Sequence, residues 1–332
     1  MAANRNEASA ARIASRDDIW VGHLQNVIEQ QYGLPITAIT AAPRGYYAET
    51  WKITTDIQDY FVKLDCTPHQ QRLRASLPVI DQLWKSGIRF INHPIPTIDG
   101  HLCTDFAGGT LAVFNWIPGH NLETNDTKPA EYDMLAQVYA VPLADVAIPR
   151  MQFNHDAADR FFTIWANLEP DSPADQVLTS HRETLELRAH RLEQLASICR
   201  GDDSGFVVTH GDAGGNFMTD GDRCYIVDWD ELQLAPPERD AWVMCTKGWA
   251  RKIFDDALHI HKVNYTLRTE RIAYFCYHML FFYLGEVLSG YNITDLAVEI
   301  QDLLEGWAKE RMDWADSLDI STTNSAMQEW SA

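Results

Sequence analysis

Two polar segments in the second half of the chain carry the side chains best suited to chemistry. The first, His210-Gly-Asp-Ala-Gly-Gly-Asn216, follows the apolar run Phe206–Val208. The second contains Asp228 and Asp230 and follows the apolar run Tyr225–Val227. Short apolar runs of this kind are typical of buried strands, so each strand delivers acids at its carboxyl end. Mg²⁺ prefers carboxylate and amide oxygens, and a carboxylate beside them can take a hydroxyl proton. The two segments therefore predict a site for phosphoryl transfer.

The same segments resemble the aminoglycoside phosphotransferase family. His210-Gly211-Asp212 with Asn216 is similar to its catalytic loop, and Ile226-Val227-Asp228 is similar to its metal loop. The longer string from Asp228-Trp-Asp-Glu231 to Ala235-Pro-Pro-Glu-Arg-Asp240 resembles the spectinomycin phosphotransferase branch. The resemblance implies an α+β, bilobal, protein-kinase-like fold. Its small lobe would hold an antiparallel sheet and a helix, and its large lobe would be mainly helical.

The resemblance also implies a role for each of these residues. Asp212 would be the catalytic residue, and Asp228 and Asn216 would be the Mg²⁺ ligands. His210 would hold the backbone of the metal loop rather than act as a base. Asp240 would bond backbone amides of the catalytic loop, although an acid in the first turn of a helix also complements the helix dipole.

One departure from the family concerns Asn216. The family places this asparagine five residues after the aspartate, whereas Asn216 is only four residues after Asp212. Either the loop is shortened and Asn216 still reaches the metal, or the role of the asparagine is displaced.

The first part of the chain has the pattern of antiparallel hairpins with one inserted helix. Alternating apolar residues between turn residues predict strands, and a capping serine with a following proline predicts the start of a helix. The expected strands are Ile36–Ala42, Tyr47–Thr55, Tyr60–Leu64, Pro94–Ile98, Leu102–Phe106 and Thr110–Ile117, and the expected helix is Ser76–Lys85, with Pro78 in its first turn. This order matches the small lobe of a kinase.

Three features of this part bear on nucleotide binding. Lys63 is a lone cation in an apolar strand, where the family places its phosphate-binding lysine; the alternative is an exposed lysine on an edge strand. Gly45 lies in a turn that could cover phosphates, or it is an ordinary hairpin glycine. Phe114, Asn115 and Trp116 lie in a run that resembles the strand linking the two lobes, whose backbone would bond the purine. The rings of Phe114 and Trp116 fit packing within the lobes better than stacking on the base.

A second departure concerns the partner of Lys63. The kinase lysine usually pairs with a glutamate on the small-lobe helix, which positions it on the phosphates. No Asp or Glu lies between Asp65 and Asp81, and Ala75 falls where that glutamate is expected. Lys63 is therefore oriented in another way, or it binds phosphate less well.

The remainder of the chain has a helical pattern. The expected helices are Pro129–Tyr139, Asp156–Trp165, Ala174–Ile198, Glu238–Thr246, Trp249–His259, Tyr265–Ser289 and Thr294–Asp316. We expect a disordered leader over 1–16, a nucleotide-binding lobe over 17–117 and a helical lobe over 118–332 that carries the loops and the substrate site. Asp230, Glu231 and Glu286 are the candidate substrate contacts, although turn capping or a solvated acidic face explains them equally well.

Composition limits the choice of partner. The chain has 27 basic and 47 acidic residues, a net charge of −20, which argues against nucleic acid and anionic membranes as partners. It favours a small cationic substrate, because an acidic cleft attracts cations, although acidity also simply confers solubility. Six cysteines without metal-binding spacing, and no apolar segment long enough to span a bilayer, predict a cytoplasmic protein.

The sequence thus predicts a Mg²⁺-dependent kinase, a monomer or homodimer. It would transfer the γ-phosphate of ATP or GTP to a hydroxyl of an aminocyclitol or aminoglycoside antibiotic. A kinase of a sugar or amino alcohol metabolite would share every motif. The shortened loop and the missing helix glutamate also allow a kinase-like protein that binds a nucleotide without turnover.

Overall fold

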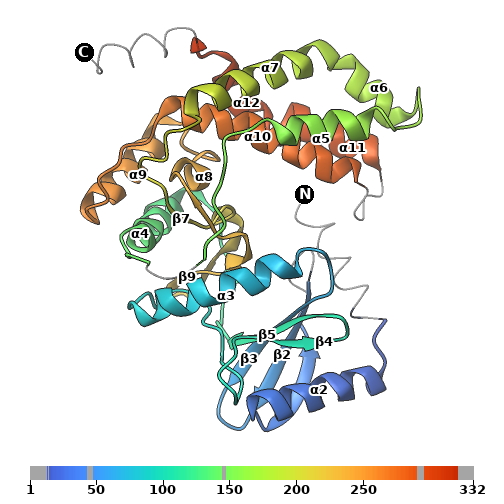
Figure 1. The fold of residues 1–332 in the computed structure, drawn as a ribbon, viewed down its shortest axis with the longest axis vertical. Helices are drawn as coiled ribbons and strands as arrows, with labels where there is room; N and C mark the ends of the chain where they lie inside the picture. Colours follow the sequence, from blue (N-terminus) through green and yellow to red (C-terminus); the bar gives the residue numbers. More distant parts are fainter. Residues whose placement is uncertain (1–12, 14, 43–47, 144–146, 290–294, 321–332) are drawn as a thin grey trace. The chain divides into compact units, whose positions relative to one another are not determined.

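The computed structural model describes residues 13, 15–42, 48–143, 147–289 and 295–320. The chain separates into two compact units, each made of two segments of sequence. The first unit contains residues 1–149 and 208–234, and the second contains residues 150–207 and 235–332 (Figure 1). The segments with Asp212 and Asp228 therefore group with the N-terminal sheet, whereas the predicted lobes divide the chain after residue 117.

A five-stranded antiparallel sheet forms the base of the first unit. Its strands are β1 (Ile36–Ala41), β2 (Glu49–Thr55), β3 (Asp59–Asp65), β4 (Thr104–Phe106) and β5 (Gly109–Asn115), in the order β1-β2-β3-β5-β4. The predicted α+β class and antiparallel sheet are thus confirmed. The expected strand over Pro94–Ile98 is wrong, because only a bridge between Pro94 and Phe114 forms there. Pro94 and Pro96 lack the N–H that a strand needs to extend a ladder.

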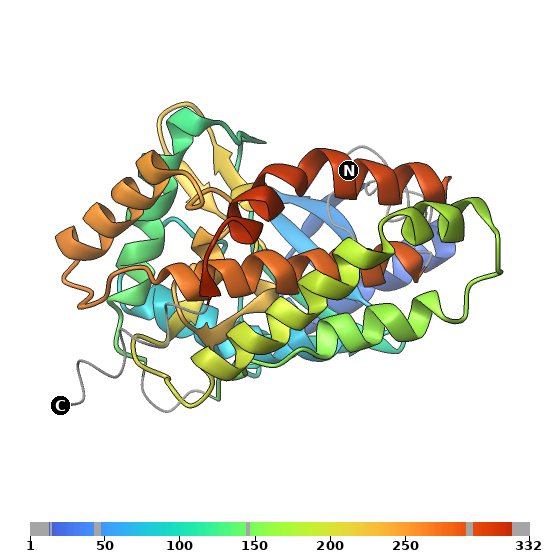
Figure 2. The same ribbon diagram turned by 90° about the horizontal axis from the view of Figure 1, so that it is seen from above.

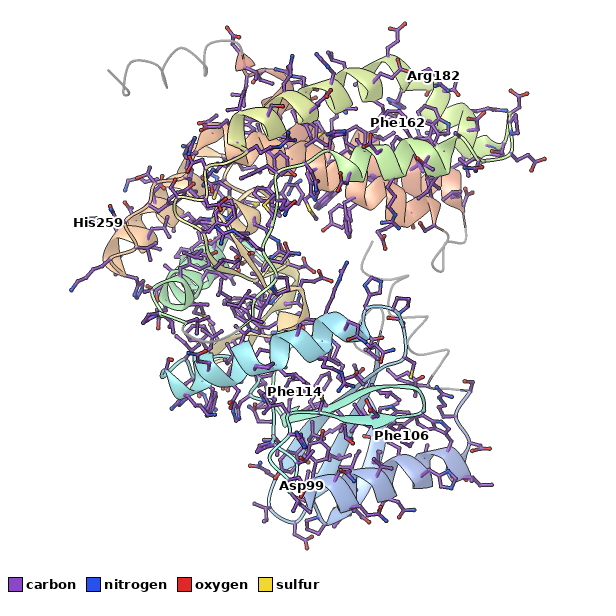
Figure 3. The ribbon with its side chains drawn as sticks, in the orientation of Figure 1. Asp99, Phe106, Phe114, Phe162, Arg182 and His259 are labelled. Carbon is purple, nitrogen blue, oxygen red and sulfur yellow. The ribbon has the colours of Figure 1, made fainter. Side chains whose placement is uncertain are left out.

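The two faces of this sheet are covered by different helices. On one face, Leu24 and Ile28 of α2 (Asp18–Tyr32) pack with Val62 and other alternate strand residues. On the other, α3 (Gln70–Lys85) packs Leu73 and Leu77 against Phe114, which Figure 3 labels. Because side chains alternate along a strand, Lys63 lies on the face covered by α3, opposite its neighbour Val62.

Helix α3 is longer than predicted. It begins at Gln70 rather than Ser76, so Pro78 lies inside the helix and not in its first turn. The added turns contain good helix formers and bury Leu73, which outweighs the loss of the one backbone donor at Pro78.

Two small sheets carry the polar segments. Strands β6 (His120–Asn121), β8 (Phe217–Thr219) and β9 (Cys224–Ile226) form a three-stranded sheet in the order β6-β8-β9. Strand β7 (Val207–Thr209) pairs with β10 (Gln233–Ala235). The polar segments follow β7 and β9, as the apolar runs predicted. Helix α4 (Lys128–Tyr139) completes the first unit.

The second unit is helical. Its helices are α5 (Asp156–Trp165), α6 (Pro173–Ser180), α7 (Arg182–Cys199), α8 (Glu238–Ala241), α9 (Gly248–Ile260), α10 (Thr269–Leu288), α11 (Leu296–Gln301) and α12 (Lys309–Asp316). Helix α10 is buried along most of its length and contacts α5 and α7, beside which it runs in Figure 2. Within the described ranges, none of the helices is both long and apolar enough to cross a lipid bilayer.

Four predicted helices of the second unit differ from the structure. The expected helix Tyr265–Ser289 begins only at Thr269, because residues 263–268 are not helical. The expected helix Ala174–Ile198 is two helices, because His181 leaves the helical region with φ −104° and ψ 6°. The helix that starts at Glu238 ends at Ala241 rather than Thr246. The expected helix Thr294–Asp316 is interrupted by a π-helical stretch, η4 (Asp302–Trp307), which accommodates an extra residue in the turn.

Candidate functional site

The segment after β7 is a tight loop that presents Asp212. Gly211 has φ +95°, a left-handed value that favours glycine, and the next side chain, Asp212, is exposed. The 3₁₀ turn η2 (Gly214–Asn216) then returns Asn216 to Asp212. The side-chain amide nitrogen of Asn216 donates to the backbone carbonyl oxygen of Asp212 at 2.8 Å. It also donates to Oδ2 of the Asp212 side chain at 3.4 Å. The four-residue spacing therefore still brings the two side chains together.

Gly215 lies beside Asp212 in this loop. The carbonyl oxygen of Gly215 accepts a hydrogen bond of 2.7 Å from Asn121 Nδ2 on β6. A Cβ at Gly215 would lie 3.5 Å from Asp212 Oδ1. The backbone of the loop therefore passes directly beside the Asp212 carboxylate, and Asn121 fixes it there.

A buried ion pair lies against the same loop. Lys128 Nζ and Glu131 Oε2, on α4, are 2.7 Å apart, and both side chains are almost fully buried. A Cβ at Gly214 would come within 3.2 Å of Lys128 Nζ and 2.8 Å of Glu123 Oε1. Sequence reasoning missed this support, because a lysine three residues before a glutamate at a helix start looks like an ordinary solvated pair.

The segment after β9 turns sharply at Asp228. Asp228 has φ +66° and ψ 56°, and η3 (Trp229–Glu231) follows it directly. Trp229 is 1% exposed, and its Nε1 donates to the carbonyl oxygen of Ile226 at 2.8 Å. Because the Trp229 indole is fixed in the core, the side chains of its neighbours Asp228 and Asp230 stay outside the core and are partly exposed.

His210 joins the two loops. Its Nδ1 accepts the backbone N–H of Asp212 at 3.1 Å, so its Nε2 carries the proton and donates to the carbonyl oxygen of Val227 at 2.9 Å. The ring is fully buried and lies edge-on to Trp229, with 4.5 Å between the ring centroids. A side chain with both nitrogens engaged positions backbone and is not available as a base.

Lys63 lies on β3 between β2 and β5. Its strand neighbours are Thr50 on β2 and Ala112 on β5, so it occupies an interior strand and not an edge. Its Nζ lies 2.5 Å from Asp228 Oδ1 and 2.5 Å from Asp230 Oδ2. The structure thus places the predicted phosphate-binding lysine at the predicted metal loop, 165 positions away from Asp228 in the chain.

Lys63, Asp228 and Asp230 shift one another's pKa values. Burial acts to lower the pKa of Lys63, but the carboxylates of Asp228 and Asp230 raise it above its ordinary value, so the lysine is protonated. Burial acts to raise the pKa of Asp228, but Lys63 outweighs it and lowers that pKa. Burial, opposed by Lys63, raises the pKa of Asp230 to about 6. Asp228 is therefore the more firmly ionised of the two acids.

The other candidate residues of the first unit have different surroundings. Glu231 pairs with Arg72 on α3 at 2.5 Å. Phe114 is core packing, and Trp116 is half-buried with Lys52 Nζ 4.7 Å from its ring centroid.

Asn115 is tied to a neighbouring segment, because its backbone N–H and side-chain oxygen both bond to backbone groups of His93. Gly45 lies outside the described residues.

Two candidate residues lie in the second unit. Glu286 on α10 forms an ion pair of 2.7 Å with Arg160 on α5, and its side chain is 13% exposed. Asp240 is buried in the first turn of α8. The substrate role of Glu286 and the supporting role of Asp240 stay predictions.

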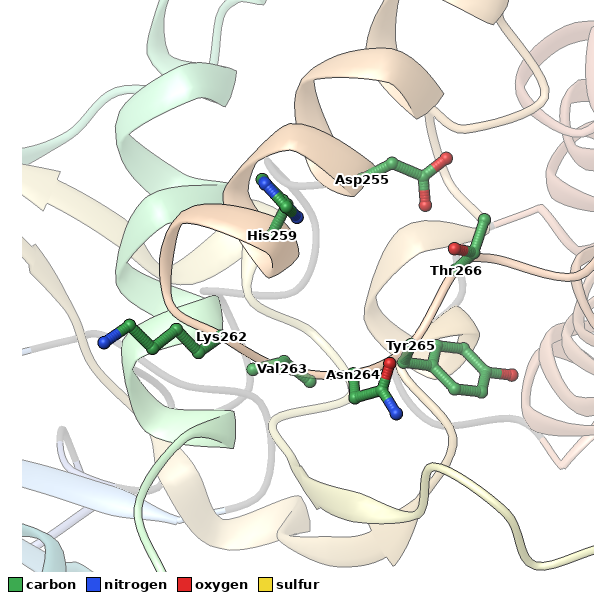
Figure 4. A pocket seen from close by; sticks show the side chains of 7 residues that line it. All are labelled: Asp255, His259, Lys262, Val263, Asn264, Tyr265 and Thr266. Carbon is green, nitrogen blue, oxygen red and sulfur yellow. The ribbon is translucent and has the colours of Figure 1, made fainter.

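The second unit also has an open pocket of about 590 Å³ (Figure 4). It is lined by the end of α9 and the segment that follows: Asp255, His259, Lys262, Val263, Asn264, Tyr265 and Thr266. Asp255 accepts the backbone N–H of Leu267, and the Tyr265 hydroxyl donates to Glu238. The pocket holds none of the predicted site residues.

No cluster of three His, Cys, Asp or Glu side chains able to hold a metal occurs in the described part of the chain. The roles of Asp228 and Asn216 as Mg²⁺ ligands stay predictions. Asp228 Oδ and the Asn216 amide oxygen are hard oxygen donors, and the Asp228 side chain is 39% exposed. Mg²⁺ typically takes one or two carboxylates and completes its shell with water and phosphate oxygens, so these residues fit it.

Comparison with solved structures identifies the fold. The chain is similar to a spectinomycin phosphotransferase solved with ADP and spectinomycin, at 18% identity, a TM-score of 0.65 and coverage of 89% of this chain and 92% of that one. It is also similar to a choline kinase from Streptococcus pneumoniae, at 14% identity, a TM-score of 0.59 and coverage of 87% and 98%. A microcompartment-associated aminopropanol kinase matches at 13% identity, a TM-score of 0.60 and coverage of 90% and 99%.

At these identities the likeness shows the fold, and it confirms the predicted protein-kinase-like class. No curated protein matches the sequence. Residues 38–274, most of the chain and both loops of the site, match the model of the phosphotransferase enzyme family. The predicted family is thereby confirmed, and the chain belongs to the phosphotransferase enzyme family.

Proposed function

We propose that this protein is a kinase that transfers the γ-phosphoryl group of ATP or GTP to a hydroxyl of a small cationic substrate. The observation that carries the proposal is the contact of Lys63 with the Asp228 turn, beside a loop that presents Asp212. A phosphate-binding cation, a metal ligand and a carboxylate for the hydroxyl are the parts that phosphoryl transfer needs.

In this mechanism Asp212 accepts a hydrogen bond from the substrate hydroxyl and orients its oxygen toward the γ-phosphorus. The new oxygen–phosphorus bond forms as the bond to the β–γ bridging oxygen breaks, so the nucleoside diphosphate leaves. The hydroxyl proton passes to Asp212 late, and an ordinary aspartate is basic enough for this. Lys63 binds phosphate oxygens.

Asp228 and Asn216 would hold the Mg²⁺ ion that neutralises charge on the β- and γ-phosphate oxygens. The hydrogen bond from the Asn216 side chain to the Asp212 backbone supports this assignment. It holds the Asn216 amide close to Asp212, whose carboxylate would bind the substrate hydroxyl. The backbone N–H of Val227 also donates to the Asn216 carbonyl oxygen at 3.1 Å, so the positions of the two proposed ligands are coupled.

For the acceptor we propose an aminocyclitol or aminoglycoside antibiotic, whose modification would confer resistance. The support is the net charge of −20, which favours a cation, and the likeness to a spectinomycin phosphotransferase. The second candidate is a metabolic amino alcohol, and the likeness to choline and aminopropanol kinases favours it. Both classes combine a hydroxyl with a positive charge.

The test couples nucleoside diphosphate release to a panel of acceptors. The panel holds aminocyclitols, aminoglycosides, choline, aminopropanol and neutral sugars, each with ATP and with GTP. We expect rapid turnover with one cationic class and slow turnover with neutral sugars. ADP binding without turnover on any acceptor would instead support a kinase-like protein that only binds nucleotide.

A further inference from the structure

The cation of Lys63 is held by one short turn. Its side chain is only 11% exposed, and two carboxylates contact it, from Asp228 and Asp230. A buried ammonium needs such partners, because removing it from water is costly and attraction to an anion offsets that cost. The two carboxylates are not equivalent, since the Asp228 side chain is 39% exposed and that of Asp230 is 19% exposed.

Helix α3 supplies no carboxylate to this lysine, although it covers the same face of the sheet. The only acid in α3 is Asp81, which is engaged by Lys85 at 2.6 Å and by His93 at 3.1 Å. Near its start, α3 contributes a cation instead, because Arg72 pairs with Glu231. The helix therefore contacts the turn η3 through Glu231, and the same turn supplies the acids to Lys63.

The geometry of the turn explains how two acids reach one cation. The backbone of Asp228 has a left-handed conformation. The buried Trp229 between the two acids is fixed by its hydrogen bond to the carbonyl oxygen of Ile226. The Arg72–Glu231 pair secures the far end of η3 to α3. Asp230 is thus held from both sides, and its contact with Lys63 is built into the fold.

We infer that Asp230 is the positioning residue for Lys63: it holds the lysine ammonium in place, while Asp228 serves as metal ligand. This inference rests on the proposed function. An ammonium has three N–H donors, so it can bond Asp230 and still donate to a phosphate oxygen. Asp230 acts through Lys63 and touches neither nucleotide nor acceptor.

A double-mutant cycle tests this assignment, with Lys63→Met, Asp230→Asn and the double variant. We measure the affinity for ADP by calorimetry, the KM for ATP, and the Mg²⁺ concentration that gives half-maximal turnover. Asp230→Asn is expected to weaken ADP binding and raise the KM for ATP by about tenfold, a coupling typical of charged residues in contact. In the Lys63→Met background the same change is expected to add almost nothing, and the Mg²⁺ requirement is expected to stay constant.

Asp59→Asn is the matched control, because Asp59 lies on the same strand and pairs with Lys52 at 2.6 Å. It is expected to leave ADP affinity unchanged. Asp230→Ser is a second uncharged variant and is expected to behave like Asp230→Asn. The unfolding temperature of each variant without nucleotide separates a loss of stability from the loss of ADP affinity.

Two results would overturn the inference. Effects of Lys63→Met and Asp230→Asn that simply multiply would show that Asp230 acts independently of the lysine. An increased Mg²⁺ requirement in Asp230→Asn would make Asp230 a metal ligand. Either result is distinct from failure of the proposed function, in which the unmodified protein itself would release no ADP or GDP with any acceptor.

Discussion

The His210 imidazole donates to the carbonyl oxygen of Val227 at 2.9 Å, one residue before the proposed metal ligand Asp228. Its other nitrogen accepts the amide of Asp212. One buried ring therefore sets the spacing between the two loops of the site. This relationship gives the first prediction.

Changing His210 to Ala removes both hydrogen bonds and leaves a cavity beside Trp229. We expect a loss of stability of about 2–4 kcal/mol together with a lower kcat, because the loops lose their common support. Thermal unfolding and steady-state kinetics measure the two effects. His210→Phe restores the volume without the bonds, and a kcat equal to that of the unmodified protein in this variant would contradict the role of the bonds.

Asp212 is predicted to act in turnover and not in nucleotide binding. Asp212→Asn is expected to lower kcat by about 10²- to 10⁴-fold, the usual contribution of a positioned proton acceptor, with ADP affinity nearly unchanged. Kinetics and calorimetry on the same preparation measure this. Asp222→Asn, in the exposed turn between β8 and β9, is the control and should keep full activity. Retention of most of the kcat in Asp212→Asn would remove the catalytic assignment.

Asp228 is predicted to bind the metal. Asp228→Ala is expected to raise the Mg²⁺ concentration for half-maximal turnover by at least about tenfold, because a divalent ion loses its charged protein ligand. Titration of the activity with Mg²⁺ after dialysis against a chelator measures this change. If the titration curve does not move, Asp228 does not belong to the ligand set.

The ion pair of Lys128 and Glu131 is predicted to matter for stability. Lys128→Met leaves Glu131 buried without the ammonium, which is expected to cost about 3–5 kcal/mol in denaturant unfolding. The double change Lys128→Met with Glu131→Leu is expected to recover most of that loss. The exposed pair of Lys252 and Asp256 is the control, and Lys252→Met should cost under about 1 kcal/mol. Equal losses at the two sites would contradict this prediction.

Stability is also predicted to depend on pH through Glu238 in the second unit. Glu238 is fully buried, and burial raises its pKa to about 7, although it accepts bonds from Tyr265 and the Arg268 amide. The folded state then retains a proton that the unfolded state loses above about pH 4.5. Glu238 therefore adds to the free energy of unfolding by an amount that is fully present below about pH 4.5 and is lost as the pH rises to about 7. The total change is on the order of 3 kcal/mol.

Glu238→Gln removes this titration. The difference in unfolding free energy between the unmodified protein and the variant should therefore change between about pH 4.5 and pH 7 and be flat above pH 8. Parallel stability curves over the whole range would show that Glu238 does not carry the effect.

The sequence predicted the parts of the molecule that local patterns determine. The acids after β7 and β9 were found because each follows a short apolar strand, and helix Asp156–Trp165 was predicted with its observed bounds. Errors arose where a local signal was overridden, as at Pro78, which α3 tolerates in its interior because its earlier residues bury Leu73. Burial of several apolar residues of α3, together with its good helix formers, outweighs the cost of Pro78.

The partners of Lys63 could not be predicted in the same way. Its contact with Asp228 joins positions 165 residues apart, and no periodicity relates a strand to a distant turn. The same is true of Asn121 and Gly215, 94 residues apart. Such pairs follow from the order of strands in three dimensions, and only the folded structure supplies it.

The chain passes between its two units three times, at residues 149, 207 and 234. During synthesis from the N-terminus, the five-stranded sheet would be complete long before the ribosome adds β7, β8 and β9. Lys63 would therefore remain without Asp228 while residues 150–207 emerge. A fragment that ends at residue 149 lacks both site loops, so neither unit can be obtained by a single cut of the chain.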